Sequence, residues 1–517
     1  MIKLDRKEKE VPENEAPENE TESREEKKDV LCSGWSFDKI IDALRFIAAP
    51  TEIPITGFAI DSRDVKPGEV FVAFKGARVD GHDFLEQAYQ KGAALALVEH
   101  MDLPALKGRS FLKVDHTGKA LMELAQYARE NTRATVVCVA GSVGKTTVRA
   151  WITHLLSAVG PTVSAQKNFN SQIGLPLSLT ALQRDATFGV FEIGIDKSGV
   201  MQSLATLCNP HVAVLTSIDK AHYAGFSSLD SLAQEKAMLF SGLCPNGIAV
   251  VNQESCEKFP FIQHIAKEYG AVDVVTVGYK AGATVRIVEA KEDFEKGTTT
   301  VTLDFAGKRL EYPLHLLGDH WVLDSALALA AAVCASFEEN SLKDIVSKKE
   351  EDFRNIFLPQ MPCLEALEGR GIIIPLCIKG RHITLIDDTY NANLASMKAG
   401  LNALLKQKAT RHIAVVGDMM ELGAISEAEH AELFELLRQS NVAKVYAVGE
   451  HVKAPWESLP PEKKGAFADS VQSLGLKLED DLQDGDAIWS KASRVVGLSG
   501  LTEYFKSFQT TKEAITL

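Results

Sequence analysis

The chain has 517 residues, a length that ordinary domain sizes divide into about three domains. Its composition, 45% hydrophobic and 24% charged, is that of a soluble globular protein. The net charge of −14 argues against nucleic acid as the main partner, because phosphate backbones are bound by clustered Lys and Arg. The eight cysteines are scattered and form no CxxC pair, so we expect free thiols in a reducing cytosol.

Three α/β blocks follow a polar start. Residues 1–35 are rich in Glu, Lys, Asn and Pro, which predicts a disordered acidic tail and no secretory signal. The remaining predicted domains are 36–133, 134–357 and 358–517. The expected strands are 55–61, 69–74 and 94–100 in the first domain, 134–141, 188–194, 211–218 and 247–252 in the second, and 382–390, 412–419 and 444–449 in the third.

Helical segments separate most of these strands, among them 83–93 and 148–159. This alternation predicts an α/β fold with mostly parallel sheets covered by helices. The longest apolar run, Ala326 to Phe337, is too short to span a bilayer and predicts a buried helix. We therefore expect no membrane attachment.

The stretch VAGSVGKTT, Val139 to Thr147, has the composition of a phosphate-binding loop. Glycines let backbone N–H groups turn toward phosphates, and the positive end of the following helix adds to the attraction. The full pattern GxxxxGK[ST] needs a glycine where this chain has Val139, but the loop follows a predicted strand and opens a predicted helix. We therefore expect ATP or GTP to bind here, with these residues as its contacts: Gly141, Ser142, Val143, Gly144, Lys145, Thr146 and Thr147.

A carboxylate suited to a metal ion comes later in the same predicted sheet. Glu192 lies at the end of the apolar run GVFEI, and open α/β sheets bind ligands at the carboxyl ends of their strands. Together with the hydroxyl of Thr146, it is a candidate Mg²⁺ ligand.

Motifs in all three blocks resemble the Mur ligases of bacterial cell-wall synthesis. The central domain carries VAGSVGKTT and KNFNSQIGLPLSL, Lys167 to Leu179, and the first carries DSRDVKPGEVFVAFKGARVDGHD from Asp61. The third carries IDDTYNANLASM, VVGDMMELG and KASR, which resemble the member of the family that adds a dipeptide. The resemblance implies three α/β domains: a small nucleotide-sugar domain, a phosphate-loop ATPase domain and a Rossmann-like domain.

The resemblance also implies the chemistry: ATP phosphorylates a peptide carboxylate, and an amine attacks the acyl phosphate. The implied substrates are UDP-N-acetylmuramoyl-tripeptide and D-Ala-D-Ala, with ATP and two Mg²⁺ ions as cofactors, in a cytoplasmic monomer. Lys145 would steady the phosphates, while Thr146 and Glu192 bind one ion. His222 would help to bind the second, although a lone histidine is more often a surface or core residue. Lys236 corresponds to a lysine that CO₂ carbamylates in the family, the alternative being an ordinary exposed lysine.

The remaining implied residues contact substrates. Asn168 and Asn170 would line the nucleotide-sugar and peptide side of the central domain, or serve loop turns. Lys491, Ser493 and Arg494 are candidates for the carboxylate of D-Ala-D-Ala, because cations suit that anion. The other implied contacts are Ser62, Arg63, Asp80, Gly81 and His82 for the uridine diphosphate end, and Asp388, Tyr390, Asn391 and Asn393 for ATP and the dipeptide.

Some positions depart from the family pattern. His320 is kept in the stretch that helps to seat adenine, but Trp321 and Asp324 stand where asparagines are usual. Trp321 either stacks on adenine or fills core. Asp219 replaces a common glycine and Leu394 a usual proline.

Three other functions are compatible with parts of the sequence. A sibling Mur-type amino-acid ligase or a folylpolyglutamate synthase shares the phosphate loop, but the third-domain motifs speak against both. A nucleotide switch would need a base-recognition stretch of the N/TKxD type, and none is clear. A degenerate, scaffold-like ligase is suggested by the departures, whereas the retained Lys145, Thr146, Glu192, His222 and Lys236 weigh against it.

Overall fold

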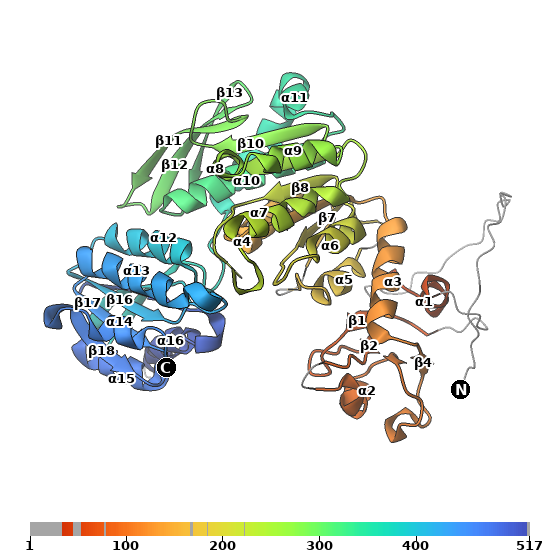
Figure 1. The fold of residues 1–517 in the computed structure, drawn as a ribbon, viewed down its shortest axis with the longest axis horizontal. Coiled ribbons are helices and arrows are strands. Elements are labelled where there is room, and N and C mark those ends of the chain that lie inside the picture. The colour runs from red at the N-terminus through yellow and green to blue at the C-terminus, as the bar shows by residue number, and fades with distance from the viewer. Residues whose placement is uncertain are drawn as a thin grey trace. The chain divides into compact units, whose positions relative to one another are not determined.

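The computed structural model describes residues 34–44, 53–76, 79–165, 169–182, 185–221 and 223–513. Residues 1–33 of the predicted tail, Asn168 and His222 therefore lie outside the described residues. The described chain forms two compact units, coloured from red to blue along the sequence in Figure 1. The first contains the described residues up to Val136, Gly160–Phe191 and Leu207–Asn209, and the second contains Val137–Val159, Glu192–Thr206 and Pro210–Leu517.

A four-stranded parallel sheet organises the first unit. Its strands lie in sequence order: β1 (Gly57–Ala59), β2 (Glu69–Val72), β3 (Leu95–Val98) and β4 (Phe111–Lys113). Alternate side chains of β2 and β3 enter two separate cores, because successive residues of a strand point to opposite faces. The helices of this unit are α1 (Phe37–Ala43), α2 (Leu85–Gln90), α3 (Thr117–Glu130) and α5 (Gly174–Leu179), and β6 (Thr162–Ser164) pairs in parallel with β7 (Phe188–Glu192).

The second unit contains seven neighbouring strands of the large sheet. Four parallel pairs join β5 to β11, whereas β11, β12 and β13 form antiparallel pairs. In sheet order the strands are β13 (Lys308–Leu314), β12 (Thr298–Phe305), β11 (Val285–Asp293), β10 (Asp273–Gly278), β9 (Ile248–Asn252), β8 (Val212–Leu215) and β5 (Thr135–Ala140).

Helix α10 (Asp319–Ser336) contains all but the last residue of the predicted buried run, Ala326 to Phe337, and every residue from Ala326 to Ala335 is buried. It packs against α4 (Lys145–Ser157), the helix that follows the phosphate loop. The other helices associated with this sheet are α6 (Met201–Cys208), α7 (Leu229–Ala237), α8 (Gln253–Lys258), α9 (Phe261–Glu268) and α11 (Leu342–Phe357). In the described parts of the chain, no helix is both long and apolar enough to cross a membrane.

A six-stranded sheet completes the second unit. Its order is β14 (Ile372–Ile378), β15 (Arg381–Asp387), β19 (Asp486–Lys491), β16 (Arg411–Gly417), β17 (Lys444–Val448) and β18 (Lys464–Ala468). Only β14 is antiparallel to its neighbour. Figure 1 shows helices on both sides of this sheet: α12 (Leu394–Leu405) and α13 (Ser426–Gln439) on one, α15 (Val471–Asp481) and α16 (Ser499–Glu513) on the other, with α14 (Lys453–Glu457) beside α13.

The predicted α/β class with mostly parallel sheets is confirmed. Each predicted strand overlaps an observed strand, and the seven described cysteines are free thiols. The antiparallel strands β11–β13 have no counterpart among the strands expected from the sequence.

Candidate functional site

The phosphate loop joins β5 to α4, and its backbone is tied to the end of β8. Ser142 N–H donates to Ser217 O at 2.7 Å, and Val143 N–H donates to Ser217 Oγ at 3.0 Å. Gly141 must be glycine, since a Cβ there would lie 2.0 Å from Thr216 Oγ1. Gly144, directly before the helix, has φ +84°, a conformation that favours glycine. The loop is therefore a rigid turn that leads into a helix N-terminus.

Thr146 and Glu192 meet beside this loop. Thr146 Oγ1 donates to Glu192 Oε2 at 2.7 Å, and the two residues are 8% and 3% exposed. Arg149, on the same helix, places Nε 3.8 Å from that carboxylate oxygen. A hydroxyl and a carboxylate are hard oxygen donors of the kind Mg²⁺ prefers, so the pair fits such an ion. Among the described residues, no three His, Cys, Asp or Glu side chains gather into a metal cluster.

Two lysine side chains donate hydrogen bonds to backbone carbonyl groups of the phosphate loop. Lys145 Nζ donates to Ser142 O at 3.2 Å, and Lys236 Nζ, from α7, donates to Gly141 O at 3.0 Å. Lys236 is 2% exposed, so it is not the ordinary exposed lysine that the sequence left open. Burial lowers the pKa of Lys145, and burial together with the nearby charge of Lys145 lowers the pKa of Lys236 well below its usual value.

Glu235 precedes this lysine and has a structural role. Its carboxylate accepts hydrogen bonds from the backbone N–H groups of Gly199, Val200 and Met201 at 2.8–2.9 Å. Met201 is the first residue of α6, so the carboxylate satisfies N–H groups that have no partner within that helix. The residue therefore connects α7 to the start of α6.

Helix α10 carries His320 and two of the departures from the family pattern, Trp321 and Asp324. Trp321 is 5% exposed and its ring lies 5.6 Å from that of Trp151 on α4, so it fills core. His320 lies 4.5 Å from Trp321, ring to ring, and burial lowers its pKa to about 4. Asp324 Oδ1 lies 2.6 Å from the position that a Cβ on Gly144 would occupy. Burial raises the pKa of Asp324 to about 7.

Arg370 is a site residue that was not predicted from the sequence. It precedes β14, and its Nη2 donates to Thr146 Oγ1 at 2.9 Å. Its guanidinium carbon lies 4.0 Å from the ring centroid of Tyr390, a distance typical of a cation–π contact. The only local signal in the sequence is a glycine on each side of the arginine, which is too common to identify a site.

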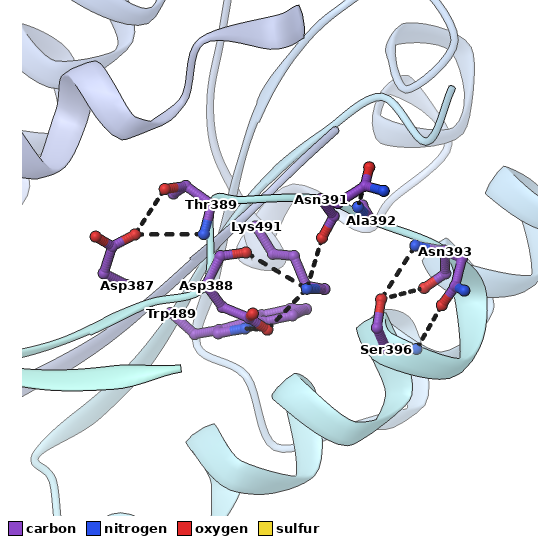
Figure 2. A network of polar contacts seen from close by, with 9 residues as sticks. All are labelled: Asp387, Asp388, Thr389, Asn391, Ala392, Asn393, Ser396, Trp489 and Lys491. Carbon is purple, nitrogen blue, oxygen red and sulfur yellow. Dashed lines mark hydrogen bonds and ion pairs between the residues drawn. The ribbon is translucent and has the colours of Figure 1, made fainter. Parts of the chain in front are cut away.

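The motif residues of the third block form a polar network around Lys491, which Figure 2 shows from close by. Lys491 is 3% exposed. Its Nζ lies 2.9 Å from Asp388 Oδ2, and it donates to Asn391 O at 2.8 Å and to Asp388 O at 3.4 Å. Trp489 Nε1 donates to the same Asp388 carboxylate at 3.5 Å. Burial raises the pKa of Asp388 and lowers that of Lys491, while each charge opposes the shift of the other.

Other polar contacts fix the ends of this motif. Asp387 Oδ1 accepts from the Thr389 hydroxyl at 2.7 Å. Asn393 caps α12, because its Oδ1 accepts from Ser396 N–H at 2.8 Å while Ser396 Oγ accepts from Asn393 N–H at 3.0 Å. The loop between β15 and α12 is thus held at both ends and through Lys491 (Figure 2).

Ser493 and Arg494 follow β19. Ser493 is 3% exposed, and its Oγ accepts from Met420 N–H at 2.8 Å. Arg494 is exposed, with its guanidinium carbon 5.8 Å from the ring centroid of Tyr390. Of the predicted cations Lys491 and Arg494, the arginine is therefore the accessible one.

Two segments of the first unit carry most of its predicted contacts: Ser62 and Arg63 follow β1, and Asp80, Gly81 and His82 lie at the 3₁₀ helix Gly81–Phe84. His82 is buried, with Nδ1 2.6 Å from Asp80 Oδ1 and Nε2 accepting from Glu99 N–H at 2.9 Å. Gly81 has room only for hydrogen, since a Cβ would lie 2.6 Å from Phe74 N. The remaining three differ in exposure: Ser62 is buried and bonded to Gln87, Arg63 is exposed and paired with Asp61, and Asn170 is half-buried.

Three family models match the chain in sequence order. The model for the Mur ligase family catalytic domain matches residues 54–129, and the model for the Mur ligase middle domain matches residues 139–332. The model for the Mur ligase glutamate ligase domain matches residues 376–494. With the phosphate loop, the Thr146–Glu192 pair and the three sheets in place, the chain belongs to the Mur ligase family, whose members are ATP-dependent ligases.

Relatives with the full domain set point to one branch of the family. UDP-N-acetylmuramoyl-tripeptide–D-alanyl-D-alanine ligase of Escherichia coli (strain K12) is 30% identical over 81% of this chain and 87% of its own length. The ligase of the same name from Rickettsia prowazekii is 28% identical over 86% and 94%. The crystal structure of MurF from Acinetobacter baumannii has a TM-score of 0.77 at 26% identity, covering 92% of this chain and 99% of that one. MurF ligase from Thermotoga maritima, in complex with ADP, has a TM-score of 0.71 at 26% identity, covering 88% and 98%.

Proposed function

We propose that this protein joins D-alanyl-D-alanine to UDP-N-acetylmuramoyl-tripeptide, with ATP as the energy source. One observation carries the proposal: the similarity to ligases of that specificity extends over almost the whole chain, including the third-domain motifs that form the Lys491 network. The activity belongs to peptidoglycan precursor synthesis, and we propose a cytoplasmic monomer.

The tripeptide carboxylate has to be made electrophilic before an amine can attack it. Transfer of the γ-phosphoryl group of ATP to the tripeptide carboxylate gives an acyl phosphate and ADP. The amine of the dipeptide then attacks the carbonyl carbon, the C–N bond forms, and phosphate leaves with the former carboxylate oxygen. Negative charge develops on phosphoryl oxygens and on the tetrahedral intermediate, so fixed cations lower the barrier.

The chain supplies those cations at the phosphate loop. Lys145 begins the helix after the loop, and Arg370 reaches Thr146 from the other side. We propose that both bind the transferring phosphoryl group. Thr146 and Glu192 would hold Mg²⁺, which when bound neutralises phosphate charge. We further propose that His222 and Lys236 hold a second ion.

The buried Lys236 suits the carbamylation that this proposal needs. A depressed pKa favours the neutral amine, and only the neutral amine is a nucleophile toward CO₂. The N–C bond that forms releases one proton and leaves an anionic carbamate in place of a cation. Such a group is an oxygen donor for Mg²⁺.

We assign residues to the two ends of the substrates by the charge and exposure of their side chains. Ser62, Arg63, Asp80, Gly81 and His82 would bind the uridine diphosphate end, with Asn168 and Asn170 toward the peptide. Arg494 would receive the dipeptide carboxylate, since Lys491 already contacts Asp388 and Asn391.

Product mass tests the proposal directly. Purified protein with ATP, Mg²⁺ and UDP-N-acetylmuramoyl-tripeptide is expected to release phosphate only when D-Ala-D-Ala is present, with a product heavier by one dipeptide residue. A single free amino acid accepted in place of the dipeptide would indicate a sibling ligase. Nucleotide binding without any new product would indicate a scaffold.

A further inference from the structure

The loop that carries Arg370 is fastened to the strand end that carries Tyr390. Gly371 N–H donates to Asp387 O at 2.7 Å, and Tyr390 N–H donates to Gly369 O at 2.9 Å. Gly369 and Gly371 have φ +68° and +81°, so the turn depends on both glycines. The backbone of Arg370 therefore moves together with that of Tyr390.

The support continues beneath the loop. A Cβ on Gly371 would lie 3.3 Å from Trp321 Cζ2, so the loop lies directly on that buried ring. Trp151, which packs against Trp321, donates its Nε1–H to Glu365 O at 2.9 Å. Two core tryptophans thus hold the segment that leads to Arg370.

The backbone alone leaves the long arginine side chain free to rotate. The ring of Tyr390 restricts it, because the guanidinium carbon lies 4.0 Å from the ring centroid while Nη2 donates to Thr146 Oγ1 at 2.9 Å. Arg370 is half-buried between these two contacts. A guanidinium that lies over a ring keeps its N–H groups available in the guanidinium plane for an anion.

We propose that Tyr390 is a positioning residue whose ring holds the guanidinium of Arg370 at the phosphate loop. This inference rests on the proposed function, because its kinetic test measures the turnover of that reaction. The same ring lies 5.8 Å from the guanidinium carbon of Arg494, so one side chain borders both the phosphoryl side and the predicted dipeptide side. The family resemblance implied that Tyr390 faces ATP and the dipeptide, and a positioning role adds to that expectation.

A double-mutant cycle separates the two roles. Y390L removes the π face and keeps an apolar side chain, whereas Y390F removes only the hydroxyl. We expect Y390L to lower kcat about tenfold, the range for a desolvated cation–π contact, and Y390F to keep most of the activity. In an R370M background, the further change to Y390L is expected to cost less than about twofold, because the group it positions is gone.

Two measurements keep the result interpretable. The cycle is run on kcat for phosphate release and on ATP affinity by calorimetry, so that an inactive R370M still yields the coupling. Thermal unfolding of each variant identifies loss of fold. Equal effects of Y390L with and without Arg370 would overturn the inference and indicate direct contact between Tyr390 and a substrate. No dipeptide-dependent product from the wild type would refute the proposed function, while the affinity cycle would still decide the role of Tyr390.

Discussion

Replacing Asp324 with Asn should change how stability depends on pH. Asp324 is 9% exposed beside Gly144, and burial raises its pKa from 3.8 to about 7, with Arg370 opposing the shift. Between these pH values the folded chain holds a proton that the unfolded chain has lost. Stability therefore falls as pH rises through this interval, by about 1.4 kcal/mol per pH unit. The total is at most about 4 kcal/mol, and structural relaxation reduces it to the order of 2 kcal/mol.

Asparagine has the same shape and no charge. D324N and the wild type should unfold at similar urea concentrations at pH 4, and D324N should be the more stable by about 2 kcal/mol at pH 8. Tryptophan fluorescence follows the transition, since Trp151 and Trp321 lie in this region. D319N, an exposed change on the same helix, is the matched control and should show no such trend. A difference between D324N and wild type that stays constant from pH 4 to pH 8 would refute the reasoning.

Three further substitutions test the site. E192Q should keep the hydrogen bond from Thr146 but lower kcat/KM by about 100-fold or more, because a neutral amide is a poor Mg²⁺ ligand. Steady-state kinetics at several Mg²⁺ concentrations would detect this loss. Full activity of E192Q would contradict it. W321A should destabilise the fold by about 3–5 kcal/mol in urea, whereas lost ATP affinity at unchanged stability would mean that the ring contacts the nucleotide. K236M should abolish turnover and raise stability at pH 7, because no amine then has to lose its proton on folding; a less stable variant would argue against a depressed pKa.

Local patterns predicted the strands and the phosphate loop because their signals lie within a few residues. The β-branched run before Gly141 became β5, and the helix expected at 148–159 is α4, which begins three residues earlier at Lys145. The same holds for Glu192, which ends β7 and meets Thr146.

Pairings between distant segments could not be predicted from the sequence. β15 and β19 are adjacent although about a hundred residues separate them, and this register brings Lys491 to Asp388. The sequence could suggest only that Lys491 and Arg494 suit an anion, not that Asp388 already meets the lysine. Arg370 was missed for the same reason, since its partners Thr146 and Tyr390 lie on other segments.

The most direct test of the account follows one oxygen atom. UDP-N-acetylmuramoyl-tripeptide labelled with ¹⁸O in its terminal carboxylate is incubated with ATP, Mg²⁺ and D-Ala-D-Ala, and the released phosphate is analysed by mass. An acyl phosphate predicts one labelled oxygen in the phosphate for each dipeptide joined. Unlabelled phosphate, or phosphate release that does not depend on the dipeptide, would contradict the account.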